Sequence, residues 1–166
     1  GVESGDDEVL RRINKGVTVA DIKKAGQAAD AAGIELSTMI ILGLGGKELT
    51  EEHAIHTADI LNALSPSMLG IMTLLPRAGT PLEQQIEVGQ FQRLSRQETL
   101  QELLTLLTRL NLPRPSILRA SHIYNFVNLA GTLPEDKETL LAQVRQSLEQ
   151  EPTIEKELTY KNYGIF

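Results

Sequence analysis

Two segments with an apolar core stand out along the chain. They extend over residues 34–42, which end in MIIL, and over residues 68–75, which read MLGIMTLL. Apolar and polar positions do not alternate in MIIL or in MLGIMTLL, whereas they alternate in a strand that is buried on one face only. Both runs therefore predict strands buried on both faces, which is typical of a parallel sheet.

Helical spacing of apolar residues marks the segments around these runs. Helices are predicted over residues 6–15, 19–32, 50–64, 95–110 and 134–149. Capping boxes support two of the starts, with Thr18 and Asp21 before one helix and Ser95 and Glu98 before another. Residues 116–120 predict a further short strand, and the strand–helix–strand order predicts parallel βαβ units.

The first two residues raise the question of a missing strand. Gly1 and Val2 read as the end of a buried strand, followed at once by a turn and a helix. A strand of two residues pairs with nothing by itself, so we expect the rest of it upstream. A whole eight-stranded βα barrel takes about 250 residues, and this chain has 166.

The predicted fold class is therefore α/β, a partial (β/α) barrel of the TIM type with parallel strands and flanking helices. Residues 1–85 are expected to form half of such a barrel. Residues 86–150 are expected to form a mostly helical C-terminal extension with a short strand, and residues 151–166 a tail.

The charge and the composition exclude several classes of function. The net charge is −6, which opposes binding to the phosphate backbone of nucleic acids and to an anionic membrane. The chain has no cysteine, so it offers no disulfide, no thiolate nucleophile and no sulfur ligand for zinc or an iron–sulfur cluster. The apolar runs are too short to span a bilayer and no signal peptide is recognised, which predicts a cytoplasmic protein.

Two segments at predicted strand ends are candidate binding sites. The turn GLGGKE, residues 43–48, precedes a helix, where free N–H groups attract anions. It lacks the third glycine of the dinucleotide fingerprint and the Ser/Thr of a P-loop, so a tight turn also explains its glycines. Glu3 and Ser4 follow the first strand at the end where parallel α/β proteins gather their active sites, although Ser4 or Asp6 would also serve as a helix cap.

The three histidines give weaker signals. His53 and His56 are spaced i, i+3 on one predicted helix, but no third metal ligand is evident, so we expect exposed histidines and no metal site. His122 lies in SHIYN after the short strand, with Tyr124 and Asn125 beside it. The residues alone favour packing of His122 in a loop over a role in chemistry, because no triad arrangement is present.

Three segments in register resemble the radical S-adenosylmethionine (radical SAM) superfamily, with a core like that of Elp3, MiaB and NifB. GVESGDDEVLRRINKG resembles the GxESG segment that closes the fourth barrel strand of that family. MIILGLGGKELTEE resembles its fifth-strand segment, and TLLPRAGTPLE resembles the sixth, which commonly ends in PGTPL. RASHIYNFVNLAGTLPEDKETLL resembles a C-terminal stretch in one branch of radical SAM oxidoreductases.

The resemblance implies a cofactor site at the three strand ends. The first strand end would face the ribose and methionyl parts of SAM, and the other two would flank adenine, mainly through backbone groups. The implied cofactor-binding residues are Glu3, Ser4, Ile41, Gly43, Leu74, Leu75 and Pro76. His122 and Asn125 would lie on the substrate side, and the resemblance names no catalytic residue.

The family's CxxxCxxC loop, which binds a 4Fe–4S cluster, would lie before Gly1. The resemblance therefore implies the C-terminal part of a radical SAM oxidoreductase for 5′-deoxyadenosyl radical chemistry, with SAM and a 4Fe–4S cluster as cofactors and the cluster ligands upstream. Its substrate would be a small or unknown molecule. The isolated chain would be inactive, and it would pair with itself or with the missing N-terminal half-barrel.

Two other classes of function compete with this interpretation. A non-catalytic α/β binding or scaffold module agrees with the lack of cysteine and predicts no affinity for SAM. A receiver-like phosphoacceptor domain needs aspartates at the strand ends, where Leu42 and Leu74 stand, and is set aside for that reason.

Overall fold

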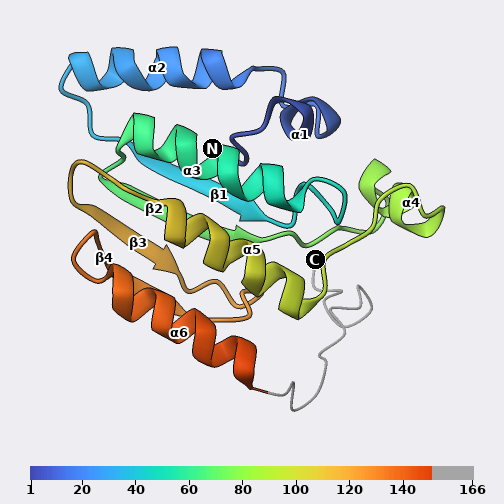
Figure 1. Ribbon diagram of the computed structural model, residues 1–166. Coiled ribbons are helices and arrows are strands. Elements are labelled where there is room, and N and C mark those ends of the chain that lie inside the picture. Colours follow the sequence, from blue (N-terminus) through green and yellow to red (C-terminus); the bar gives the residue numbers. More distant parts are fainter. Residues whose placement is uncertain (151–166) are drawn as a thin grey trace.

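Four strands form one open sheet within residues 1–150, the part of the chain that this computed structural model describes (Figure 1). In sheet order they are β1 (Ser37–Leu42), β2 (Met68–Thr73), β3 (Ser116–Ala120) and β4 (Leu129–Leu133). The helices are α1 (Asp7–Arg12), α2 (Val19–Ala31), α3 (Thr50–Leu64), α4 (Pro81–Glu87), α5 (Arg96–Arg109) and α6 (Lys137–Glu149). The predicted tail, residues 151–166, lies outside the described residues.

The strands predicted from the two apolar runs and from residues 116–120 are confirmed. β1, β2 and β3 run parallel, with Ser37 opposite Met68 at the start of the β1–β2 pair. β4, which the pattern does not predict, runs antiparallel to β3 and therefore needs no crossover helix. The α/β class with flanking helices is thus confirmed. The sheet of the described residues is open, so the predicted partial barrel is not confirmed.

The division of the chain near residue 85 stays a prediction. β3 and β4 fall in the predicted helical extension, yet they join the same sheet as β1 and β2. The pattern also misses α4, whose start carries recognisable signals. Thr80 caps it by accepting a hydrogen bond from the Glu83 amide, and Pro81 occupies its first turn.

The two-residue strand at the N-terminus has a partner in the sheet. The amide groups of Val2 and Glu3 both donate to the Met39 carbonyl, and the Glu3 carbonyl accepts from the Ile41 amide. Glu3 forms a parallel bridge with Ile40 on the outer side of β1. The expectation that this strand pairs with nothing is therefore wrong, because three hydrogen bonds fix it along the edge of β1.

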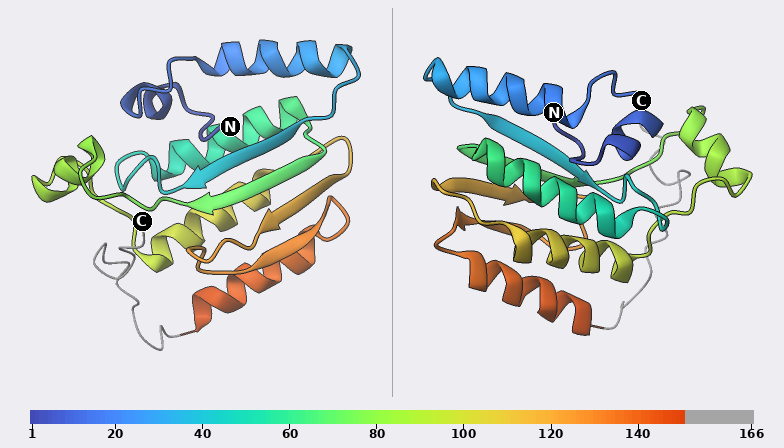
Figure 2. Two further views of the ribbon diagram at one scale, coloured as in Figure 1. Left: turned by 180° about the vertical axis from the view of Figure 1, so that it is seen from behind. Right: turned by 45° about the horizontal axis from the view of Figure 1, so that its top comes forward.

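One face of the sheet is covered and the other is open. α3, α5 and α6 pack on the same side, and the view from behind in Figure 2 (left) shows the strands in front of these helices. Ile40 and Leu69 point into the covered face and are buried, whereas Met39 and Met68 on the opposite face are 43% and 41% exposed. The prediction of strands buried on both faces is therefore wrong for the described chain, because no helix within residues 1–150 lies on the second side.

The core lies between the covered face and the three helices. It is built from the inward stripes that the helical spacing predicts, which include Ala58, Leu61, Leu64, Leu100, Leu103, Leu107, Leu140, Leu141 and Val144. α2 contacts α3 beside the sheet, and Gly26 is its buried residue. Both predicted capping boxes, at Thr18 and Ser95, are present. A search of the described helices finds none with the length and apolarity needed to cross a membrane.

Candidate functional site

The three strand ends singled out in the sequence lie side by side. The bridge between Glu3 and Ile40 places the N-terminal segment next to β1, and the Leu74 amide donates to the Leu42 carbonyl at 2.9 Å. Because the three strands are parallel, their carboxyl ends share one edge of the sheet, near α1 and α4 in Figure 1. We call residues 3–5, 41–46 and 74–76 the strand-end edge.

Glu3 enters this edge with an unusual backbone. Its φ is +63°, in the left-handed region that residues other than glycine seldom adopt. Such a conformation costs on the order of 1–3 kcal/mol and persists where the surroundings fix it, often at functional sites. Here the pairing with β1 fixes it from one side, and Lys15 Nζ lies 3.1 Å from the Glu3 carboxylate.

Ser4 points away from solvent and into the protein. It is fully buried, its Oγ lies 2.8 Å from His53 Nδ1, and it accepts a hydrogen bond from the Asp6 amide. Asp6, in turn, caps α1 by accepting from the Val9 amide. A contact of Ser4 with a ribose stays a prediction, and it would require the hydroxyl to leave His53.

His53 is buried, so the prediction that it is exposed to solvent is wrong. It belongs to the first turn of α3, which packs against the strand-end edge, and only 1% of it is exposed. Its Nε2 lies 3.0 Å from the Ile41 carbonyl, which can only accept. Nε2 therefore carries a proton and donates to this carbonyl, while Nδ1 shares a hydrogen bond with the Ser4 hydroxyl.

His56 is half exposed and pairs with a carboxylate. Its Nδ1 lies 2.7 Å from Asp6 Oδ2. Burial alone would raise the pKa of Asp6, but the Val9 amide and His56 outweigh it and hold the pKa below the usual value. Among the described residues no group of three His, Cys, Asp or Glu side chains could hold a metal ion.

Glu102 is a buried carboxylate that the sequence interpretation missed. It comes from α5 and is only 3% exposed. Its Oε1 accepts from the Gly43 amide at 2.7 Å, and its Oε2 accepts from the Thr50 hydroxyl at 2.6 Å. Burial raises the pKa of Glu102, although His53 and both hydrogen bonds act in the opposite direction. We call Ser4, Thr50, His53 and Glu102 the polar cluster.

A signal for Glu102 does exist in the sequence. It lies three residues after Thr99 and four before Leu106, and both of these face the core. That spacing places a charged side chain on the apolar stripe of a helix, where an unpaired carboxylate is costly. A buried partner for Glu102 was therefore predictable, but the identity of that partner was not.

The glycine-rich turn after β1 is a tight turn in the structure. Gly43 and Gly46 have φ of +83° and +59°, and the Gly46 amide donates to the Gly43 carbonyl. Glycine adopts these angles without the steric cost that a side chain would add. The tight-turn explanation of the glycines is thus confirmed, and their contact with a ligand stays a prediction.

The backbone groups of the predicted adenine site differ in their availability. The amides of Ile41 and Gly43 are engaged by the Glu3 carbonyl and by Glu102. The Leu75 amide, by contrast, makes no hydrogen bond to another described residue. Leu74 and Leu75 are half-buried, and Pro76 is buried. Within residues 1–150, the third strand end therefore offers a backbone donor without a partner, between apolar groups.

A cleft of about 360 Å³ opens at the same strand end, where Leu74 lines it. It lies between the end of α1, the glycine-rich turn and α4, and Leu44, Leu74 and Phe91 form its apolar walls. Arg12 and Asn14 are among its polar residues. Pockets of this size and mixed lining at the carboxyl ends of parallel strands are the usual place for a small ligand in α/β folds.

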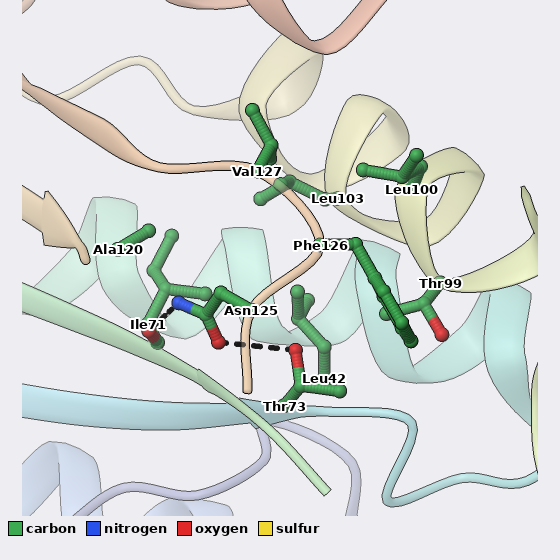
Figure 3. Close-up of a pocket in the computed structure, with 10 residues that line it drawn as sticks. All are labelled: Leu42, Ile71, Thr73, Thr99, Leu100, Leu103, Ala120, Asn125, Phe126 and Val127. Carbon is green, nitrogen blue, oxygen red and sulfur yellow. Dashed lines mark hydrogen bonds between the residues drawn. The ribbon is translucent and has the colours of Figure 1, made fainter. Parts of the chain in front are cut away.

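Asn125 lies at a second, much smaller pocket, of about 10 Å³ (Figure 3). Its Nδ2 donates to the Ile71 carbonyl at 2.8 Å, and its Oδ1 accepts from the Thr73 hydroxyl at 3.1 Å. The pairing of β3 with β2 ends at Gly70. Beyond that point the Asn125 side chain, in place of a β3 backbone group, binds the β2 carbonyl of Ile71. The pocket holds one water at most, and the predicted substrate-side role of Asn125 stays a prediction.

His122 is exposed on the loop after β3. Its ring packs at a tilt against Tyr124, with the ring centroids 5.0 Å apart. The backbone amide of Asn125 donates to the His122 carbonyl, so the two residues share one turn. The structure thus places the His–Asn pair together through the backbone, and the role of His122 on the substrate side stays a prediction.

Comparisons with known proteins give partial matches. No family model matches the chain. An uncharacterized protein of Methanocaldococcus jannaschii is 34% identical over 94 residues, which cover 57% of this chain and 29% of that protein. A probable threonylcarbamoyladenosine tRNA methylthiotransferase of the same organism is 30% identical over 112 residues, which cover 66% of this chain and 26% of that protein.

A solved structure shares the fold. It is the archaeal Methanocaldococcus infernus Elp3 with an N-terminal deletion, with a TM-score of 0.56 and 23% sequence identity over 65% of this chain and 26% of that one. The chain thus spans less than a third of the length of each of these relatives. The similarity to a tRNA methylthiotransferase and the fold shared with Elp3 together support a relationship of this chain to the radical SAM superfamily.

Proposed function

We propose that this chain is the C-terminal part of a radical SAM oxidoreductase and supplies the adenine and ribose side of its SAM site. The observation that carries the proposal is the strand-end edge. Three segments, each resembling a different strand end of that family, lie next to one another in the expected order, with Val2 and Glu3 paired in parallel beside β1.

The residues at this edge fit a SAM molecule in part. The Leu75 amide, which has no partner among the described residues, would donate to adenine, Leu74 and Pro76 offer apolar contact, and the adjoining cleft has room for a small ligand. Glu3 is the polar side chain nearest to a ribose in this proposal. Bound SAM would supply the 5′-deoxyadenosyl group for radical chemistry on the substrate.

The chain does not fit the second cofactor of the proposal. A 4Fe–4S cluster needs cysteine thiolates, and this sequence contains none. Its ligands are expected in the part of the protein before Gly1. The substrate stays open: one relative is named for a reaction on tRNA, whereas the net charge of −6 on this chain favours a small molecule.

The coding DNA upstream of Gly1 tests this function directly. We expect a CxxxCxxC segment within the preceding few hundred residues, in frame with this chain. A start codon directly before Gly1 would overturn the enzyme and leave a non-catalytic α/β binding or scaffold module as the explanation.

The open face of the sheet is the proposed contact for the missing N-terminal half-barrel or for a second copy of the chain. Met39, Met68 and Ile117 lie exposed on it, and such an apolar surface is rarely left bare in a soluble monomer. We therefore expect the isolated chain to self-associate at micromolar concentration, as measured by light scattering. A stable monomer under these conditions contradicts the self-association.

A further inference from the structure

The polar cluster lies behind the strand-end edge and joins two helices to it. Glu102 on α5 holds the Gly43 amide, and His53 on α3 holds both the Ile41 carbonyl and the Ser4 hydroxyl. The two helices are thereby connected to two different strand ends. No predicted cofactor contact uses His53 or Glu102, so their role requires a separate explanation.

We propose that Glu102 and His53 are positioning residues, which fix the backbone of residues 41–43 and of Ser4 in the geometry that the ligand meets. This inference rests on the proposed function, because it assigns a task to side chains behind the same site. It reassigns Ser4 as well, whose hydroxyl joins the cluster instead of facing the ligand.

The Gly43 backbone shows why Glu102 is needed. With φ at +83°, Gly43 turns its amide toward α5, where the residue is buried. A buried donor without a partner is costly, and a carboxylate on the apolar stripe of α5 is retained only when it is hydrogen-bonded. Glu102 gives the buried Gly43 amide an acceptor through Oε1. Its own carboxylate is fully hydrogen-bonded as well, because Oε2 accepts from the Thr50 hydroxyl.

His53 ties the first strand end to the second. Its two ring nitrogens contact groups from different segments, Ser4 at 2.8 Å and the Ile41 carbonyl at 3.0 Å. Nε2 of His53 also lies 3.8 Å from Glu102 Oε1, so the two positioning residues lie side by side. A displacement of either strand end would therefore break a hydrogen bond of His53, whose side chain is buried.

The Gly43 amide reports on this arrangement in the ¹H–¹⁵N spectrum of the chain. In the unmodified chain we expect its signal to follow the ionisation of Glu102, with a midpoint above that of an ordinary glutamate because burial raises this pKa. The groups that face the carboxylate are His53 and Thr50. Glu102→Gln keeps an acceptor for Gly43 but cannot ionise, so the signal should no longer titrate with this midpoint.

Glu102→Leu removes the acceptor altogether. The Gly43 amide proton should then move to the lower shift of an amide without a strong acceptor. The affinity for SAM, followed by titration in the same spectra, should fall roughly ten- to hundredfold, since small displacements of binding groups have effects of this order. Glu102→Gln should stay close to the unmodified chain. Gln101→Leu, at the exposed neighbouring position, is the matched control and should change neither readout.

Two results would overturn the inference. One is a Gly43 signal that keeps the same titration in Glu102→Gln. The other is a folded Glu102→Leu chain with the same Gly43 shift and the same affinity as the unmodified one; if this variant does not fold, the Glu102→Gln titration decides. If SAM shifts no signal of the unmodified chain, the Gly43 titration alone decides whether Glu102 holds the strand end, and the proposed function is tested separately by the coding DNA upstream of Gly1.

Discussion

Replacing Gly5 by alanine should lower the free energy of unfolding by about 3 kcal/mol, near the upper end for overpacking of a core. Gly5 packs directly on the backbone of α3, where an added Cβ would clash with the His56 carbonyl and lie 2.6 Å from Thr57 Cα. Backbone atoms in the middle of a helix cannot move aside cheaply. The loss is measurable by urea denaturation of Gly5→Ala beside the unmodified chain.

Gly70→Ala is the matched control for this substitution. Gly70 lies in β2, and an added Cβ would meet its neighbours at 3.6 Å, which is ordinary contact. Alanine is favoured over glycine in a strand by roughly 0.5–1 kcal/mol, so this variant should be neutral or slightly more stable. A Gly5→Ala variant as stable as Gly70→Ala would show that the segment after Ser4 does not pack on α3 as described.

Truncating Leu61 to alanine should cost about 2–5 kcal/mol of unfolding free energy. Leu61 projects from α3 into the covered face of the sheet and has no exposed surface. Its removal leaves a cavity that the surrounding helices and strands fill only in part. Urea denaturation of Leu61→Ala at the same protein concentration as the unmodified chain gives the value.

Met68→Ala tests the open face of the sheet, as Leu61→Ala tests the covered one. Met68 is 41% exposed, so its truncation in a monomer should cost about 1 kcal/mol or less. A loss for Met68→Ala as large as that for Leu61→Ala would mean that the open face is covered in solution. In that case the cost should depend on protein concentration, because association contributes to the measured stability.

Several features of the site depend on contacts between distant parts of the chain. Ser4 and His53 are 49 positions apart, and Gly43 and Glu102 are 59 positions apart. Capping rules assign Asp6 to α1 correctly because the cap and the amide it accepts from are three residues apart. No local rule connects Glu102 to Gly43, so this part of the site could not be predicted.

The sequence by itself determined the parallel strands β1, β2 and β3, the main helices, the caps of α1, α2 and α5, and the three segments of the strand-end edge. These features follow from apolar periodicity and from hydrogen bonds between neighbours in the chain. Only the tertiary structure decided that one sheet face stays open, that Val2 and Glu3 pair with β1, that β4 returns antiparallel, and that His53 and Glu102 are buried. Each of these depends on which distant segments pack together, and a pattern along the chain does not contain that information.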